Sequence, residues 1–390
     1  MVRHRREEAT IDTAHAEWDP RSEAVQADQV AGYDAMRARG PIAYDGDRSW
    51  TVFGHAEAVR ILDDPATFSN AVSRHLQIPN GLDGERHRAY RAVVDRYFTV
   101  ERLAAFEPAC RAVAAELVAA LPRGRAVEVM SALAEPFADN ITCAFMGWPD
   151  ALRAPLRAWA EKNRRATRAG DRAALSAVAV EFDGHIRAQL DARRGEPVTD
   201  PTGELLHETA DGRPLRDEEI VSIVRNWTVG ELSTIAASVG VVAGFLANHP
   251  EVQDRLRTDP SLLVAASDEI LRIDPPFVAS RRRVTAEHRV AGCLLPVDAR
   301  VQVLWASVNR DEAVFGDPDE FRLDRDPADN LVYGRGVHYC PGAPLARLEL
   351  RVLFEELLGG TARITPADGR AAVPARYPNG GFAELTLQFD

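Results

Sequence analysis

A cysteine in a glycine-rich loop is the residue best placed to do chemistry. Residues 333–347 read Tyr-Gly-Arg-Gly-Val-His-Tyr-Cys-Pro-Gly-Ala-Pro-Leu-Ala-Arg, with Cys340 near the centre. From Leu345 apolar residues recur at helical spacing, so Cys340 precedes a helix N-terminus, where backbone amides favour the metal-binding thiolate. His338 adds a donor for an anionic group. The loop can bend sharply and come close to a flat ligand because it contains three glycines: Gly334, Gly336 and Gly342.

A lone cysteine in a turn is more often a buried structural residue. Zinc would need further ligands nearby, and no second cysteine lies close in the sequence. The whole pattern resembles the haem-binding loop of the cytochrome P450 superfamily, Phe-Gly-x-Gly-x-His-x-Cys-x-Gly-x-x-Leu-Ala-Arg. It matches at every fixed position except that Tyr333 replaces phenylalanine. The resemblance implies that Cys340 ligates the iron and that Tyr333, Gly334 and His338 contact the haem.

The composition indicates one large domain spanning residues 1–390. The chain is 46% hydrophobic and 27% charged, with no glycine- or proline-rich spacer. Residues 1–20 are polar, so we expect a flexible N-terminus with neither signal peptide nor membrane anchor. Four scattered cysteines fit a reducing compartment, and a net charge of −12 argues against nucleic acid as a partner. We therefore expect a cytoplasmic protein that binds no membrane.

Two basic side chains on one helix face form a second candidate site. His87 and Arg91 are four residues apart and suit a bound carboxylate. They match the family's His-x-x-x-Arg pattern for a haem propionate. The resemblance further implies a propionate contact from a neighbouring strand, for which Arg283 matches best, although Arg281 and Arg282 leave the choice open.

The candidate substrate contacts are spread over three segments. Residues 70–82 have no helical or alternating pattern, and by the resemblance this loop covers the distal pocket, although an ordinary surface loop fits equally well. A C-terminal hairpin is expected to place its tip in the pocket. The candidates are Arg74, His75, Leu76, Ile78, Val229 and Phe382.

A long central helix is expected over residues 217–247, where no proline interrupts the pattern and apolar residues occur on all sides. It would be roughly 45 Å long and buried. Gly230 near its middle costs up to about 1 kcal/mol relative to alanine and so needs a packing or functional reason. The segment around it resembles the family's oxygen-binding groove, Ala-Gly-x-(Glu or Asp)-Thr, but has Leu232 at the acid position and Ser233 at the alcohol position.

These departures bear on the reaction. Gly230, Ser233 and Thr234 are the catalytic candidates, because either hydroxyl could donate a hydrogen bond. Glu231 points about 100° away from position 232, so it cannot simply take over that position. We infer a proton relay that is weakened or rerouted. Two reactions stay open: hydroxylation, and oxidative coupling or crosslinking of aromatic groups, including those of a small peptide.

Glu269 and Arg272 are three residues apart on a helix and can pair side by side. A surface ion pair worth a few tenths of a kcal/mol is one interpretation. The resemblance instead implies the Glu-x-x-Arg element that braces the cysteine loop. A third, basic partner is usual in the family, but its position holds Glu320 here, which leaves Arg322 or Arg325 as the partner.

The resemblance spans most of the chain and implies a mainly α fold with a small β lobe (α+β). Haem b (iron protoporphyrin IX) would lie between the long central helix and the cysteine loop and its helix. Electrons would come from a separate ferredoxin and ferredoxin reductase, and the substrate would be a specialised metabolite, either a small molecule or a small peptide. A haem-binding sensor or a catalytically silent relative is the alternative.

Overall fold

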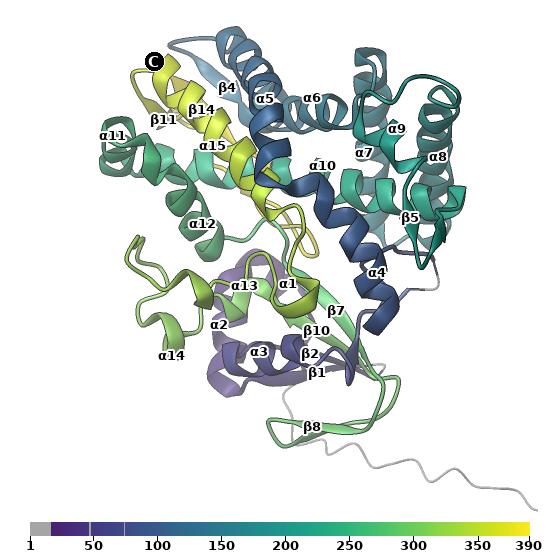
Figure 1. Cartoon of the computed structure of the whole chain (residues 1–390). Coiled ribbons are helices and arrows are strands. Elements are labelled where there is room, and N and C mark those ends of the chain that lie inside the picture. The colour runs from purple at the N-terminus through teal and green to yellow at the C-terminus, as the bar shows by residue number, and fades with distance from the viewer. Residues whose placement is uncertain (1–16, 47, 74) are drawn as a thin grey trace, which may run out of the picture.

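The structure is a computed structural model that describes residues 17–46, 48–73 and 75–390. As predicted, it is mainly helical with a small β lobe, which lies below the helices in Figure 1. The helices are α1 (Glu23–Ala27), α2 (Gln29–Arg39), α3 (His55–Asp63), α4 (Gly84–Asp95), α5 (Val100–Ala120), α6 (Glu135–Met146), α7 (Arg153–Ala169), α8 (Arg172–Asp191), α9 (Pro201–Leu205), α10 (Asp217–Asn248), α11 (Pro250–Thr258), α12 (Leu263–Ile273), α13 (Trp305–Val308), α14 (Glu312–Phe315) and α15 (Ala343–Gly360).

Helix α10 is the central element of the helical part. Its 32 residues span about 48 Å, and it packs against α6, α8, α12 and α15. Asp217 is its first residue, and Arg216, not Asp217, occupies the N-cap position. By length and mean hydropathy (1.7) the helix could cross a membrane, but 67% of that window is buried inside the fold, as expected for a core helix.

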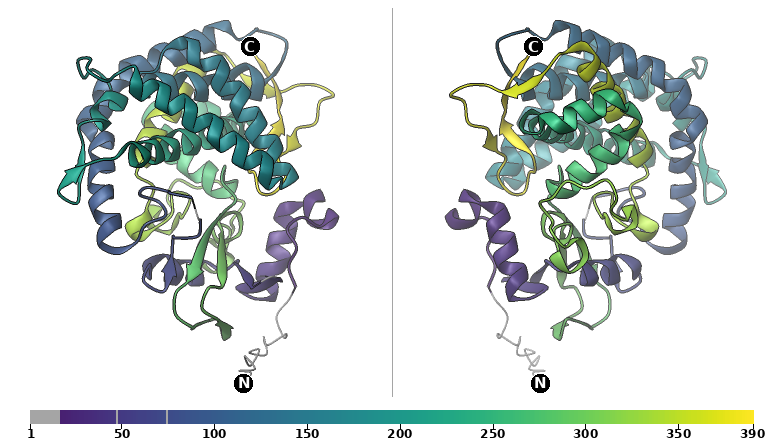
Figure 2. Two further views of the ribbon diagram at one scale, coloured as in Figure 1. Left: turned by 90° about the vertical axis from the view of Figure 1, so that its right-hand side faces the viewer. Right: turned by 90° about the vertical axis from the view of Figure 1, so that its left-hand side faces the viewer.

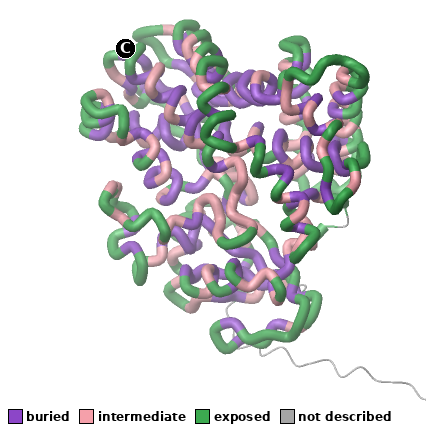
Figure 3. The backbone as a smooth tube through the Cα atoms, in the orientation of Figure 1, coloured by how far each residue is buried: buried purple, intermediate pink, exposed green. Residues whose placement is uncertain are grey.

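The helix that follows the cysteine is held on two sides. Helix α15 packs against α5 and α12, and its apolar residues Leu348, Val352 and Leu357 are buried there, as their spacing predicts. The loop before α15 lies in the middle of the molecule, yet most of its residues are only half-buried (Figure 3). The fold therefore presents this loop on a rigid helix while leaving it partly open.

The β lobe is built on a sheet in the order β1-β2-β10-β7-β3. Its strands pair antiparallel except that β10 runs parallel to β2. Over the described residues, the strands of this sheet and of four smaller sheets are β1 (Ile42–Gly46), β2 (Ser49–Val52), β3 (Phe68–Ser69), β4 (Ala126–Glu128), β5 (Thr209–Ala210), β6 (Arg213–Pro214), β7 (Ala279–Val284), β8 (His288–Val290), β9 (Cys293–Leu295), β10 (Arg300–Leu304), β11 (Ile364–Pro366), β12 (Val373–Pro374), β13 (Phe382–Glu384) and β14 (Thr386–Phe389). Side views show α1 and α2 on the flank of this lobe (Figure 2).

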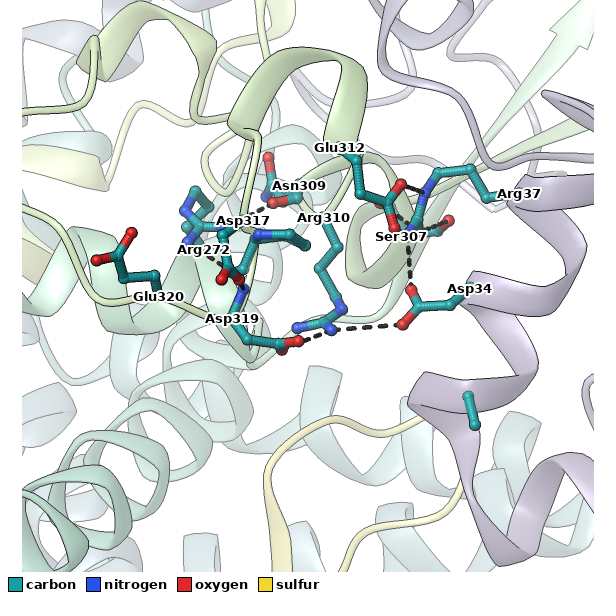
Figure 4. Close-up of polar contacts among 12 residues, drawn as sticks. Asp34, Arg37, Arg272, Ser307, Asn309, Arg310, Glu312, Asp317, Asp319 and Glu320 are labelled. Atoms are coloured by element: carbon teal, nitrogen blue, oxygen red, sulfur yellow. Dashed lines mark hydrogen bonds and ion pairs between the residues drawn. The ribbon is translucent and has the colours of Figure 1, made fainter.

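Ion pairs tie α2 to the segment after β10 (Figure 4). Arg37 binds Glu312 with Nη2–Oε1 at 2.8 Å, and its side chain is only 6% exposed. Arg310 bridges Asp34 and Asp319 at 3.4 and 2.7 Å. Because both arginine side chains are buried and hydrogen-bonded, these pairs fix α2 to the stretch that leads toward the cysteine loop.

Candidate active site

The cysteine loop folds back on itself in the way its glycines predict. The backbone N–H of Cys340 donates to the carbonyl of Tyr333 at 2.9 Å. Gly334 and Gly336 have φ of +74° and +69°, in the left-handed region, and a Cβ on Gly336 would lie 3.0 Å from the carbonyl oxygen of Leu62. Glycine is therefore required at position 336 for both conformation and space.

The sulfur of Cys340 lies at the start of α15, as expected. Burial raises the pKa of the Cys340 thiol, whereas the backbone N–H groups of Gly342 and Ala343, together with Arg91 and Arg347, act to lower it. Without a bound metal, burial is the largest of these effects on the pKa of the Cys340 thiol. A bound metal cation would reverse this balance, because a coordinating thiol is deprotonated by the metal's charge.

Tyr333 packs inside the loop under an arginine. The Arg347 guanidinium lies 4.6 Å from the centre of the Tyr333 ring, and its Nε donates to Asp268 Oδ2 at 2.9 Å. Arg347 also donates to the Tyr339 hydroxyl at 3.2 Å. Burial raises the pKa of Tyr333, and the nearby Asp268 carboxylate raises it further. The two tyrosines and Asp268 thus fix the loop from the α12 side.

Glu269 and Arg272 form a buried fork-to-fork pair. Arg272 Nε and Nη2 donate to the two Glu269 oxygens at 2.8 and 2.9 Å. Arg272 is 1% exposed and Glu269 is 6% exposed. The third partner is Arg325, whose Nε donates to Glu269 Oε1 at 3.0 Å. Arg322 contributes only its backbone N–H, at 3.2 Å. The surface-pair interpretation is therefore wrong.

This pair braces the cysteine loop through backbone carbonyls. Arg272 donates to the carbonyls of Asn309 and Pro318 at 2.8 and 2.9 Å. The Asn309 side chain in turn accepts from the backbone N–H of Leu331 at 2.8 Å, two residues before Tyr333. A continuous chain of hydrogen bonds therefore runs from α12 to the start of the loop.

His87 and Arg91 lie on one face of α4 and both face the cysteine loop. The His87 and His338 rings are 4.2 Å apart between centroids, and His338 Nε2 lies 3.3 Å from Asp83 Oδ1. Arg91 donates to the carbonyl of Tyr339 at 2.7 Å. Burial, and then Arg91, lower the pKa of His87. Burial and then His87 lower the pKa of His338 to about 4.

Arg282, not Arg283, joins this group. Successive residues of β7 point to opposite faces, and Arg282 is buried while Arg283 is exposed and pairs with Asp298 at 3.1 Å. The charge of Arg282 also lowers the pKa of His338, and burial lowers the pKa of Arg282 itself to about 10. The prediction for Arg283 is thus corrected by one residue, because the sequence did not fix which face of the strand turns inward.

These residues fit a haem. Arg282 is buried but donates only to neutral oxygens, the Ser280 hydroxyl at 3.3 Å and the Arg281 carbonyl at 2.9 Å. Burial without an anionic partner is costly, so propionates would complete the group. The sulfur of Cys340 would hold the haem iron. Over residues 17–46, 48–73 and 75–390 no cluster of three or more His, Cys, Asp or Glu could hold a free metal ion.

The surface of α10 is open at its middle. We call this open stretch, formed by Gly230, Ser233 and Thr234, the distal groove. Gly230 and Ser233 are exposed although α10 is a core helix, and no atom lies within 4 Å of a Cβ placed on Gly230. The Ser233 hydroxyl donates to the Val229 carbonyl at 3.0 Å, and the Thr234 hydroxyl donates to that of Gly230. Two polar hydrogens therefore border an open space.

The predicted substrate loop is fastened to α10. Ser222 Oγ accepts from the backbone N–H of Ile78 and donates to the carbonyl of Leu76, both at 2.9 Å. Ile78 is fully buried in the core, so the prediction that it contacts substrate is wrong. Leu76 and His75 are exposed and stay candidates. Arg74 lies outside the described residues. Val229 is half-buried beside the groove.

The C-terminal hairpin reaches α10 through Phe382, the expected residue, but away from the distal groove. The Phe382 ring packs on Gly240 and Gly244, whose added Cβ atoms would lie 3.8 and 3.0 Å from it. These glycines lie six and ten residues beyond Thr234, the last residue of the distal groove, which is about 9 and 15 Å along the helix. Phe382 is half-buried and packs against α10 away from the distal groove, so its contact with substrate stays a prediction. The exposed ring of Phe277 lies next to the hairpin, where its backbone pairs with Asn379.

The sequence is similar to known proteins over most of its length. Residues 168–359 match the family model described as Cytochrome P450. Erythromycin C-12 hydroxylase of Saccharopolyspora erythraea is 32% identical, covering 87% of this chain and 89% of that protein. Cyclomarin C epoxidase CymV of Salinispora arenicola is 30% identical, covering 81% of this chain and 84% of that one.

Solved structures are similar over nearly the whole chain. Open cytochrome P450 EryK from S. erythraea superposes with a TM-score of 0.85 at 30% identity, covering 93% of this chain and 97% of that chain. HmtN, a hydroxylase involved in himastatin biosynthesis, gives a TM-score of 0.80 at 29% identity, covering 92% and 96%.

Proposed function

This chain belongs to the cytochrome P450 family and is a haem b-dependent monooxygenase, and from that premise we propose that it inserts one oxygen atom into a specialised metabolite. The relatives favour insertion over coupling, since they are named as a hydroxylase and an epoxidase. The haem, held through Cys340, would supply the activation of dioxygen. The residues of this chain bind the group, orient the substrate and provide protons.

The observation that carries this proposal is the distal groove. Its open space beside Gly230 would admit a small ligand, and two hydroxyls border that space. Thr234 can turn its O–H away from the Gly230 carbonyl to hold or pass a proton at that point. Ser233 can do the same from the exposed side. The exposed ring of Phe277 is a further candidate for substrate contact.

Oxidative coupling of aromatic groups is the second candidate, and one observation favours it. The residue at the acid position of the groove pattern is Leu232, an apolar side chain only 6% exposed. An apolar residue there removes a proton donor that oxygen insertion uses, whereas coupling can proceed by hydrogen abstraction and recombination within the substrate.

Product mass distinguishes the two reactions. The holoenzyme would be supplied with NADPH, a surrogate ferredoxin and its reductase, ¹⁸O-labelled dioxygen, and a panel of macrolides and cyclic peptides. Insertion predicts products that carry one ¹⁸O atom, and coupling predicts products that have lost two hydrogens and carry no label. No product from any compound, together with a thiolate-type carbon monoxide spectrum, would refute both and favour a haem-binding sensor.

For electron delivery we propose docking of a ferredoxin at α4. Arg86 and Arg88 are exposed there, next to the helix face that holds the cysteine loop. Arg88 makes only a long, exposed contact with Glu85 at 3.6 Å, whereas Arg96 and Arg347, which could also serve, pair more closely with Glu208 and Asp268. Reversing the charge of Arg86 and Arg88 should raise the KM for the ferredoxin at low salt. An unchanged KM would exclude this face. A ferredoxin partner also implies a cytoplasmic enzyme.

A further inference from the structure

Two glutamates from the helices that flank the site are buried against each other. Glu231 belongs to α10, next to Gly230, and Glu349 belongs to α15, the helix that follows Cys340. Glu349 is 0% exposed, and the two carboxyl groups lie within hydrogen-bonding reach of each other. Neither glutamate has a role in the function described so far.

The pair is incompatible with two ionised carboxylates. Glu231 Oε1 and both Glu349 oxygens are buried and have no donor among the described residues. No basic group in the described part of the chain acts on either carboxyl. Ionised carboxylates only accept hydrogen bonds, so two of them side by side would leave uncompensated buried charge. One shared proton supplies the missing donor.

The surroundings also favour a retained proton. Burial has the largest effect on the pKa of Glu231 and raises it, although the adjoining Thr142 hydroxyl of α6 acts to lower it. The thiols of Cys143 on α6 and Cys110 on α5 face Glu231 and Glu349 respectively, and burial raises both thiol pKa values, so they stay neutral. Burial raises the pKa of both glutamates, and for Glu349 the neighbouring carboxyl raises it further. Such a pair titrates as a unit and holds a proton near neutral pH.

Glu231 is also placed to reach the distal groove. Beyond its first turn, α10 carries no other acidic residue. Thr234 lies three residues further on and therefore on a neighbouring face, with about 5–6 Å between the Cβ atoms. The Thr234 hydroxyl donates to the carbonyl of Gly230, a residue of the groove. Glu231 thus does not point in the direction of Leu232, and by helical spacing the groove hydroxyl nearest to it is that of Thr234.

We propose that Glu231, sharing a proton with Glu349, is the proton donor to the distal groove through the Thr234 hydroxyl. This inference rests on the proposed function, because inserting one atom of dioxygen with two electrons consumes two protons and releases water. In each transfer the Glu231 O–H proton passes to the Thr234 oxygen, which releases its own proton into the groove. The proton held by Glu349 then moves to Glu231, and the pair is reprotonated from solvent.

The test compares Glu231→Gln and Glu349→Gln with Glu218→Gln, an exposed first-turn glutamate of the same helix, as the matched control. Circular dichroism verifies that each variant folds. The first readout is the infrared carbonyl band of a protonated carboxylic acid in resting holoprotein at pH 7. The second is NADPH-dependent dioxygen consumption with a surrogate ferredoxin and reductase, in water and in heavy water.

We expect the band in the parent protein and in the Glu218→Gln control, and its loss in both pair variants. Glu231→Gln should slow dioxygen consumption roughly tenfold or more and change the solvent isotope effect, since general acids contribute about 10²-fold or more. A parent protein without the band overturns the proposal. So does a Glu231→Gln variant with the control's rate and isotope effect, which would mean that the pair only packs. Absence of an oxygenated product would refute the proposed function while leaving the infrared result intact.

Discussion

Replacing Arg272 should release the cysteine loop from α12. Arg272→Met keeps most of the side-chain volume but removes two charge-assisted hydrogen bonds to Glu269 and those to the carbonyls of Asn309 and Pro318. Glu269 would then keep only Arg325 as a charged partner in a buried setting. Breaking a buried, hydrogen-bonded ion pair costs about 3–5 kcal/mol. We expect a loss of that size in the free energy of unfolding.

The assay is urea unfolding of the holoprotein at fixed free haem, followed by tryptophan fluorescence and by the haem absorbance. Arg283→Met is the matched control, because its exposed pair with Asp298 should contribute no more than about 1 kcal/mol. Arg272→Lys keeps a charge but not the planar fork, so it should be intermediate. The reasoning fails if Arg272→Met unfolds at the control's urea midpoint and retains the same haem spectrum.

Four further changes test other parts of the site. Cys340→Ala should abolish the thiolate-type carbon monoxide spectrum; an unchanged spectrum would refute the ligand assignment. Arg282→Met should weaken haem retention measured by transfer to apomyoglobin, and equal retention in Arg283→Met and Arg282→Met would refute the corrected assignment. Pro341→Leu adds a backbone N–H near the sulfur and should raise the reduction potential in spectroelectrochemical titration; an unchanged or lower value contradicts this. Hydrogen bonds from Arg213 and Arg216 hold the pKa of Glu219 well below its usual range, so the stabilisation that Glu219 contributes is complete above about pH 4.5 and falls as the pH drops toward the lowered pKa. Glu219→Gln should therefore make the free energy of unfolding less dependent on pH below about pH 4.5. An unchanged pH dependence in this variant would exclude the role of Glu219.

The parts of the site that could be predicted are those encoded by short local spacing. The loop around Cys340, the i,i+3 pair of Glu269 and Arg272, and the i,i+4 pair of His87 and Arg91 each depend on one helix or one turn. The fold class followed from the same patterns, because helical periodicity and a buried central helix are local properties. The comparisons confirm the family and the fold.

What could not be predicted depends on contacts between distant segments. The choice between Arg282 and its neighbours Arg281 and Arg283 stayed open because inward and outward positions alternate along β7, and only pairing with β10 fixes which is which. The place where Phe382 packs could not be predicted, because the sequence of a hairpin does not say where on α10 it lands. The contact of Glu231 with Glu349 joins two helices more than a hundred residues apart, and no spacing rule relates them.

The parallel pairing of β2 with β10 limits when the enzyme can take up its cofactor during synthesis. Ser49 leaves the ribosome about 250 residues before its partner Arg300, so the sheet stays incomplete over that interval. Strand partners separated by such a loop pair slowly, because closing the loop loses chain entropy before any contact forms. Arg282 lies in this sheet, and Cys340 is translated later still. Haem incorporation therefore follows the synthesis of β10 and of Cys340, and slow closure of the sheet delays it further.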